Sequence, residues 1–174
     1  MPGAILTVAN ATHTIYRKSY GKLTYNNQIH DVEVNNNTKY DIASITKVMA
    51  ATYSIMQLMS SNSIKLTDPI TKFYSNYDVN KKGNTTIANL LLHNSGQKYD
   101  YPGALPKTTD EVINYIVFAK PDNPVGTAFQ YSNLGFLLLS LIVSKVRGVS
   151  FEQYVKQNNI FAGLTNTGFN PPQS

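Results

Sequence analysis

The sequence contains no cysteine and few charged residues. Without cysteine the chain can form no disulfide, carry no thiol nucleophile and build no cysteine metal site, which leaves its compartment open. Charged residues make up 14% of the 174 residues and apolar residues 42%, with asparagine, serine, threonine and tyrosine filling the gap. This composition predicts a folded globular chain, long enough for one domain with a hydrophobic core.

Long apolar runs, clustered basic residues and spaced metal ligands are also lacking. The longest apolar run, residues 134–143, is too short to span a bilayer, and no signal peptide precedes the first apolar stretch. The net charge is +5, but the basic residues are scattered, which argues against a nucleic-acid partner. The histidines, His13, His30 and His93, lack metal-ligand spacing. We therefore expect no metal and no cofactor.

The apolar pattern predicts a β-hairpin followed by a helical region. Residues 4–9 and 14–20 favour strands, and the polar stretch 22–37 is expected to be a loop with too few apolar residues for a core face. Helices are predicted at 44–60, 109–119, 134–146 and 151–158, the last introduced by Ser150, and a short apolar helix at 87–92. A short helix beginning at Pro69 would be capped by Asp68, and residues 74–84 would form a polar loop.

The stretch from Tyr40 to Lys47, Tyr-Asp-Ile-Ala-Ser-Ile-Thr-Lys, leads directly into the first predicted helix. Residues three apart in an α-helix are related by about 300° of rotation and ~4.5 Å of rise, so Ser44 and Lys47 share one face. The lysine amine could then reach and activate the serine hydroxyl. The alternative is a serine N-cap followed by a solvated lysine. A first-turn lysine, however, lies against the positive end of the helix dipole, where stability would not place it.

A second polar group, Tyr131-Ser132-Asn133, stands immediately before the most apolar predicted helix. Residues two apart in an extended segment point the same way, so the Tyr131 hydroxyl and the Asn133 amide would project together. The alternative is a buried tyrosine beside an N-cap asparagine. His93, which precedes Asn-Ser-Gly, has no acidic neighbour in the sequence. We expect it to act as a helix C-cap or a buried hydrogen-bonding group.

Taken together, Ser-x-x-Lys at Ser44 to Lys47 and Tyr-x-Asn at Tyr131 to Asn133 resemble the serine β-lactamase and penicillin-binding-protein superfamily. The resemblance is closest to the branch of class C β-lactamases, D-Ala-D-Ala carboxypeptidases and related esterases. Supporting similarities along the chain include Pro2-Gly3-Ala4, Leu66-Thr67-Asp68-Pro69, Leu91-Leu92-His93-Asn94-Ser95-Gly96 and Gly163-Leu164-Thr165-Asn166-Thr167. It implies an α+β fold, the α/β/α sandwich of β-lactamases and transpeptidases. Residues 1–174 would be a single domain with the N-terminal hairpin and helical region, incomplete at the C-terminus.

The resemblance also implies a role for each site residue. Ser44 would be the acylated nucleophile, Lys47 its proton acceptor, and Tyr131 the group that passes the proton towards the leaving group. Asn133 would contact the lysine and a substrate amide, and the Ser44 backbone N–H would form half of the oxyanion hole. The implied activity is hydrolysis of an amide or ester bond through an acyl-Ser44 intermediate. Members of the family are often extracytoplasmic.

The chain departs from the family in one motif. The strand motif Lys-Thr-Gly or His-x-Gly, which in the family supplies the second oxyanion donor, does not follow Tyr131. Loss of one such donor costs about 2.7 to 4 kcal/mol of transition-state stabilisation. The alternative function is therefore a truncated binding or assembly module with weak or no catalysis. The hairpin would also lack neighbouring strands, which a homo-oligomer or a further C-terminal segment could supply.

Overall fold

The computed structural model describes residues 3–24, 32–103 and 108–170. His30 and the centre of the predicted loop at 25–31 lie outside the described residues, as does Pro2. The chain divides into two compact units, Met1–Ile42 and Ala43–Ser174, and each is described by itself. The expectation of one domain over residues 1–174 stays a prediction.

The first unit is a two-stranded antiparallel sheet, as predicted. Strand β1 (Gly3–Ala9) pairs with β2 (Thr14–Gly21) from Gly3 opposite Gly21 to Ala9 opposite Thr14. In the turn, the Asn10 side-chain oxygen accepts hydrogen bonds from the backbone N–H groups of Thr12 and His13, both at 2.9 Å. An asparagine that bonds to the backbone two and three residues ahead is a frequent way to close such a turn.

The segment after the described part of the loop returns to the hairpin. The Val34 N–H donates to the Gly21 carbonyl oxygen at 2.9 Å, and the Arg17 side chain donates to the Asn36 carbonyl oxygen at 2.8 Å. Val34 is 7% exposed, so one apolar side chain of this stretch is buried although the stretch was expected to have too few for a core face. Its burial depends on Gly3, where a Cβ would collide with the Val34 side chain.

The hairpin leaves most of its larger apolar side chains exposed. These are Leu6, Val8, Ile15, Tyr16 and Tyr20. A two-stranded hairpin alone is marginally stable in water, because it buries little apolar surface. The sheet therefore exposes apolar side chains that could pack against another segment or another chain.

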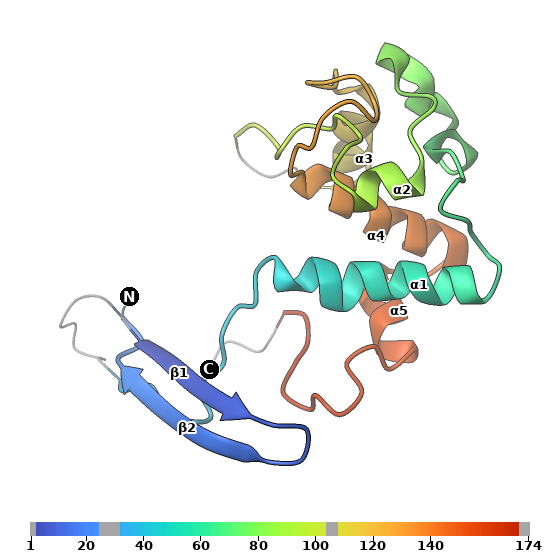
Figure 1. Cartoon of the computed structure of the whole chain (residues 1–174). Coiled ribbons are helices and arrows are strands. Elements are labelled where there is room, and N and C mark those ends of the chain that lie inside the picture. The colour runs from blue at the N-terminus through green and yellow to red at the C-terminus, as the bar shows by residue number, and fades with distance from the viewer. Residues whose placement is uncertain (1–2, 25–31, 104–107, 171–174) are drawn as a thin grey trace. The chain divides into compact units, whose positions relative to one another are not determined.

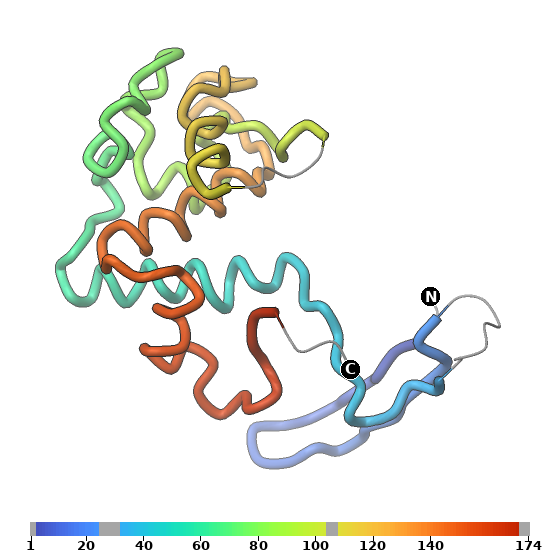
Figure 2. Tube along the Cα trace, turned by 180° about the vertical axis from the view of Figure 1, so that it is seen from behind, coloured from blue at the N-terminus to red at the C-terminus, as the bar shows by residue number. Residues whose placement is uncertain are grey.

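The second unit is built around α4 (Asn133–Arg147), which carries the fully buried side chains Leu138, Leu139, Ile142 and Val143. It packs against α1 (Tyr53–Ser60), α2 (Ile87–Leu91), α3 (Thr109–Phe118) and α5 (Phe151–Gln157). Both views show α4 between α1 on one side and α2 and α3 on the other (Figure 1 and Figure 2). Within the described ranges, no single helix is long and apolar enough to cross a membrane.

The helix ends follow the sequence signals. Thr86, Thr108 and Ser150 each cap a helix and form a reciprocal capping box with the residue three positions on. Ser132 caps α4, and Gly148, with φ of 69°, ends it in the left-handed conformation that glycine adopts most readily. The predicted positions of these helices are confirmed.

The first helix differs from the prediction because it begins later and starts as a π-helix. Ser44 lies in a turn, and η1 (Lys47–Thr52) has π-helical geometry before it continues into α1. The Thr52 hydroxyl donates to the Lys47 carbonyl oxygen at 3.0 Å, five residues back. Single π-turns of this kind are frequent at functional sites.

Two predictions between α1 and α2 are wrong. Asp68 does not cap the short helix η2 (Ile70–Lys72); its carboxylate instead accepts hydrogen bonds from the Lys65 backbone N–H and the Lys72 ammonium. The expected polar loop contains the 3₁₀-helical segment η3 (Ser75–Lys81), which is kinked near its end. The fully buried Tyr77 anchors it to the core, which the polar residues around it concealed in the sequence.

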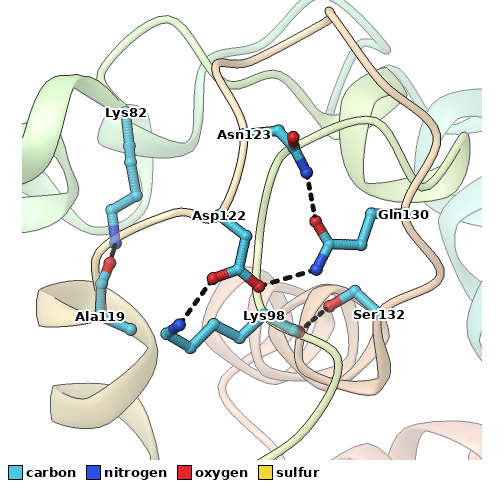
Figure 3. A network of polar contacts seen from close by, with 7 residues as sticks. All are labelled: Lys82, Lys98, Ala119, Asp122, Asn123, Gln130 and Ser132. Carbon is cyan, nitrogen blue, oxygen red and sulfur yellow. Dashed lines mark hydrogen bonds and ion pairs between the residues drawn. The ribbon is translucent and has the colours of Figure 1, made fainter.

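Lys82, which follows η3, is fully buried and was not singled out from the sequence. Its ammonium donates hydrogen bonds to three carbonyl oxygens at the end of α3: Ile116 at 2.9 Å, Val117 at 2.6 Å and Ala119 at 2.9 Å. Figure 3 shows the last of these contacts. The last carbonyls of a helix have no intrahelical partners, so Lys82 supplies the donors that α3 lacks.

Candidate active site

Ser44 lies exposed at the N-terminal end of the first helical segment. The residue before it, Ala43, has φ of 42°, a left-handed conformation that non-glycine residues seldom adopt and that is associated with functional sites. The turn is closed by a hydrogen bond of 3.0 Å from the Lys47 N–H to the Ser44 carbonyl oxygen. Backbone N–H groups at a helix N-terminus have no intrahelical acceptor, so the Ser44 N–H can face a substrate beside the hydroxyl.

Lys47, the first residue of η1, connects Ser44 to the start of α4. Its half-buried ammonium donates to Ser44 Oγ at 3.0 Å and to Asn133 Oδ1 at 2.8 Å. The same Nζ lies 4.9 Å from the centroid of the Tyr131 ring. The prediction that Lys47 reaches the Ser44 hydroxyl is therefore confirmed, and the reading of Lys47 as a freely solvated lysine is wrong.

Tyr131 approaches Ser44 from the segment before α4. Its hydroxyl donates to Ser44 Oγ at 2.7 Å. Hydrogen bonding with Lys47, followed by that with Ser44 and the Lys47 charge, lowers the pKa of the Tyr131 hydroxyl below its usual value. Both neighbours stabilise the phenolate form, so the hydroxyl can release and recover a proton more readily than an isolated tyrosine.

The Ser44 oxygen thus accepts two hydrogen bonds, one from Lys47 and one from Tyr131. A serine hydroxyl has two lone pairs and one proton, so both lone pairs are occupied in this arrangement. If either partner loses its proton, the corresponding hydrogen bond can reverse and the partner can accept the Ser44 proton. The geometry can therefore convert Ser44 into a nucleophile through two adjacent bases.

His93 stabilises the segment that carries Tyr131. Its Nδ1 accepts a hydrogen bond from the Ser132 backbone N–H at 3.0 Å, and its ring stacks on Tyr131 with 4.4 Å between centroids. Burial, then the charge of Lys47, lowers the pKa of His93, which favours the neutral ring that this acceptor role requires. The predicted hydrogen-bonding role of His93 is confirmed.

Asn133, the first residue of α4, also contacts a residue that the sequence did not indicate. Its side-chain Nδ2 donates to Asp100 Oδ2 at 2.9 Å, and its backbone N–H donates to the Tyr99 carbonyl oxygen at 2.7 Å. The helix N-cap is Ser132, so the alternative reading of Asn133 as the cap is wrong. Nothing in the sequence links Asp100 to Asn133, because 33 residues separate them.

A polar network anchors the segments on either side of the site. Asp122 accepts from Lys98 Nζ at 2.6 Å and from Gln130 Nε2 at 2.7 Å, and the Ser132 hydroxyl donates to the Lys98 carbonyl oxygen at 2.6 Å (Figure 3). The Lys98 hydrogen bond is the main cause that lowers the pKa of the Asp122 carboxyl. These contacts join residues 98–100 to the segment that carries Tyr131 and Asn133.

The site is an open arrangement of side chains without a metal cluster. Among residues 3–24, 32–103 and 108–170, no group of three histidine, aspartate or glutamate side chains could hold a metal ion. A hollow of about 580 Å³ lies elsewhere in the second unit, lined by α5 and by residues that include Phe161 and Phe169. Ser44, Lys47 and Tyr131 do not line it, so the site is recognised by its hydrogen bonds and not by an enclosed cavity.

Comparison with known proteins gives consistent matches. The family model described as "Beta-lactamase" matches residues 1–174. A protein of Escherichia coli O157:H7, named as a D-alanyl-D-alanine carboxypeptidase, is 31% identical over 190 residues, which cover 98% of this chain and 44% of the relative.

Solved structures with the same fold include a D-alanine carboxypeptidase from Burkholderia cenocepacia (22% identity, TM-score 0.79, 98% of this chain and 46% of that one). A class C β-lactamase from Rhodobacter sphaeroides matches with 21% identity and a TM-score of 0.72, over 94% of this chain and 44% of that one. An octameric penicillin-binding-protein homologue from Pyrococcus abyssi matches with 31% identity and a TM-score of 0.70, over 90% of this chain and 37% of that one. The β-lactamase/transpeptidase fold predicted from the sequence is confirmed, and it is present as the hairpin and the helical part. The chain spans less than half the length of these proteins.

Proposed function

Because this chain belongs to the beta-lactamase family, we propose that it is a serine hydrolase that cleaves an amide or ester bond through a covalent acyl-Ser44 intermediate. One observation carries the proposal: Ser44 Oγ accepts hydrogen bonds from both Lys47 Nζ and the Tyr131 hydroxyl. Few structural roles require an exposed serine to have two titratable donors within 3.0 Å of its oxygen.

In the acylation step, Ser44 Oγ attacks the substrate carbonyl carbon and transfers its proton to the neutral amine of Lys47. The new Oγ–C bond creates a tetrahedral oxyanion next to the Ser44 backbone N–H. Tyr131 then delivers a proton to the departing nitrogen or oxygen, the C–N or C–O bond breaks, and Tyr131 regains a proton from Lys47. Proton transfers by positioned groups of this kind contribute about 10²- to 10⁴-fold in rate.

In the deacylation step, a water molecule attacks the Ser44 ester. The neutral amine of Lys47 accepts one proton from the water, and the Tyr131 hydroxyl donates one proton to Ser44 Oγ as the acid product leaves. Tyr131 then regains a proton from Lys47. Asn133 Oδ1 receives a hydrogen bond from Lys47 and keeps the amine directed at Ser44 through both steps. The substrate we propose is a β-lactam, a D-amino peptide or an ester, in line with the names of the relatives.

Residues 1–174 do not contain the strand motif that supplies the second oxyanion donor in the family, which limits the rate expected of these residues alone. With the Ser44 N–H as one donor, the chain should acylate about 100- to 1000-fold more slowly than a complete oxyanion hole allows. Another segment or a second copy of the chain could supply this donor. The proposal therefore predicts slow but Ser44-dependent chemistry for residues 1–174 alone.

The test is hydrolysis of p-nitrophenyl acetate, followed as a burst of nitrophenolate and a slower steady phase. We expect a burst of no more than one equivalent in the wild type and none in Ser44→Ala. Ser75→Ala is the matched control, since Ser75 is another exposed serine at the start of a helical segment. A burst that survives Ser44→Ala, or the lack of any Ser44-dependent product, would exclude the proposed activity.

A second candidate function is a binding or assembly module of the same family without efficient turnover. The exposed apolar side chains of the hairpin, including Leu6, Val8 and Ile15, favour it, because they offer a surface for another chain. Light scattering on the purified chain tests this function. A stable oligomer together with no Ser44-dependent turnover would support it, and a monomer with turnover would refute it.

A further inference from the structure

We propose that Asp100 is a positioning residue for this site: its carboxylate fixes the Asn133 side-chain amide so that Oδ1, and not Nδ2, faces Lys47. The role rests on the function proposed above, in which Lys47 accepts the Ser44 proton. Within the described part of the chain, the Asp100 carboxylate hydrogen-bonds to Asn133 and Tyr101 and not to Ser44 or Lys47, so it acts through Asn133.

The first argument is the polarity of the two contacts of Asn133. The ammonium of Lys47 can only donate hydrogen bonds, and the neutral amine that the acylation step requires still has two N–H donors, with its one lone pair left for Ser44. An ionised aspartate can only accept hydrogen bonds. With Oδ1 at 2.8 Å from Lys47 Nζ and Nδ2 at 2.9 Å from Asp100 Oδ2, both neighbours are satisfied. A flipped amide would place its NH₂ group against the ammonium and its oxygen against the carboxylate. Asp100 therefore makes one of two nearly isosteric orientations strongly preferred.

The second argument is that the Asp100 carboxylate is itself anchored. Its other oxygen, Oδ1, accepts a hydrogen bond from the Tyr101 backbone N–H at 2.9 Å. The backbone before Asp100 is also hydrogen-bonded to the start of α4. The Ser132 hydroxyl donates to the Lys98 carbonyl oxygen, and the Asn133 N–H donates to the Tyr99 carbonyl oxygen. A carboxylate with both oxygens engaged can orient a neighbouring amide, whereas a freely rotating one could not.

The fixed orientation has two consequences for the reaction. The lone pairs of Asn133 Oδ1 stay directed at Lys47, which keeps the amine within reach of Ser44 Oγ. Of the two Nδ2 hydrogens of Asn133, one is committed to Asp100, and the other is left for a substrate carbonyl. The substrate contact expected of Asn133 is therefore restricted to a single donor in a defined direction.

The competing account is that Asp100 only closes the local turn through Tyr101. Two substitutions separate the accounts. Asp100→Asn retains an oxygen that can accept from Asn133, while Asp100→Leu removes every acceptor. Asp110→Leu removes a different exposed carboxylate, in the first turn of α3, and is the charge-matched control.

The first measurement is the pair of Asn133 side-chain amide protons in a ¹⁵N-labelled sample, assigned by their loss in Asn133→Asp. We expect one proton to be shifted by its charged acceptor in the wild type and the two shifts to converge in Asp100→Leu. Unchanged Asn133 amide shifts in Asp100→Leu would overturn the proposal. This readout does not require the protein to be active.

The second measurement is the rate of Ser44 modification by an uncharged fluorophosphonate, followed by intact mass. Loss of a hydrogen bond to a charged group at a partly exposed position predicts a decrease of about tenfold for Asp100→Leu. Asp100→Asn should recover most of the rate, and Asp110→Leu should match the wild type. A wild-type rate in Asp100→Leu, or an equal decrease in Asp100→Asn, would overturn the positioning role.

The two failures can be told apart. If the wild type is not modified at all, the proposed hydrolase function fails, and the amide shifts alone decide whether Asp100 orients Asn133. If the wild type is modified and Asp100→Leu matches it in both rate and amide shifts, the function stands and the positioning role is refuted.

Discussion

Replacement of Lys82 by methionine tests how this fold stabilises a buried charge. Methionine keeps most of the length and apolar volume of the lysine stem but removes every hydrogen-bond donor. The Ile116 carbonyl oxygen would keep a partner, because Gln97 Nε2 also donates to it at 2.9 Å. The carbonyl oxygens of Val117 and Ala119 would lose the donor that Lys82 provides.

Two opposing contributions decide the size of the effect. A buried carbonyl left without its donor costs about 1 to 3 kcal/mol, so we expect about 4 kcal/mol for Val117 and Ala119 together. Against this, burial lowers the pKa of Lys82 from 10.5 to about 8, so keeping Lys82 protonated in the folded state costs free energy at pH 7. Methionine removes that cost, which is at most about 3 kcal/mol at 1.36 kcal/mol per pKa unit. The expected loss of unfolding free energy at pH 7 is therefore only about 1 kcal/mol.

The two contributions separate when the pH is raised. Between pH 8 and 10.5 the unfolded chain still binds the Lys82 proton while the folded chain has released it, so the wild type becomes more stable as pH rises. Lys82→Met lacks this gain. The stability difference between the two proteins should widen from about 1 kcal/mol at pH 7 towards about 4 kcal/mol near pH 10.5.

The assay is urea unfolding followed by circular dichroism at pH 7.0, 8.5 and 10. Lys81→Met is the matched control, because Lys81 is the exposed neighbour of Lys82 and its replacement should change stability by less than about 0.5 kcal/mol at every pH. A difference between wild type and Lys82→Met that stays constant, or shrinks, as pH rises would refute the reasoning.

Three further substitutions test the surroundings of the site. Gly96→Ala should lower the unfolding free energy by at least about 2 kcal/mol in thermal unfolding, because φ at Gly96 is 72° and a Cβ there would collide with the Asn123 carbonyl oxygen. His93 has a lowered pKa, so the unfolded chain binds its proton first and the wild type should lose stability as pH falls below about 6.5. His93→Asn should lack that loss in urea titrations at pH 5 and 7. Tyr131→Phe should slow Ser44 acylation by a penicillin about 100-fold but by a nitrophenyl ester less than about 10-fold, because an amide nitrogen must be protonated to leave whereas nitrophenolate leaves as a stable anion. Equal effects in stopped-flow assays would contradict the proton-transfer role.

The contact between Ser44 and Lys47 could be predicted from the sequence because it depends mainly on their separation by three residues at a helix start. Any serine and lysine three residues apart near a helix start share a face, and the structure brings their side chains to 3.0 Å. What the spacing could not reveal is the π-helical geometry of η1, which is accompanied by the Thr52 hydroxyl bond to the Lys47 carbonyl oxygen. It also gave no sign of the positive φ at Ala43.

The approach of Tyr131 and Asn133 to the same point could be inferred only by resemblance. The alternation of side chains in an extended segment places Tyr131 and Asn133 on one side before an apolar helix, but it does not show which residues they contact. Asp100 was missed for the same reason, since a single exposed aspartate has no distinguishing neighbours in the sequence. Contacts between residues 33 and more positions apart depend on how helices pack, which apolar periodicity alone does not determine.

Lys82 shows a different limit of sequence reasoning. Lys81 and Lys82 are adjacent and look equivalent, yet one is exposed and the other is fully buried against the end of α3. The difference arises because Lys82 follows the kinked end of η3, which directs its side chain into the core. A lysine is rarely buried without partners, and here the partners are carbonyl oxygens of a helix that lies more than 30 residues further along the chain.

The central claim is that Ser44 is a nucleophile, and intact-mass measurement after treatment with a fluorophosphonate tests it most directly. We expect one adduct on the wild-type chain, located by peptide mapping on Ser44, and no adduct on Ser44→Ala. No adduct on the wild type, at a reagent concentration and time sufficient to label a protein that reacts about 1000-fold more slowly than an active member of the family, would contradict the claim. An adduct that persists in Ser44→Ala would contradict it equally.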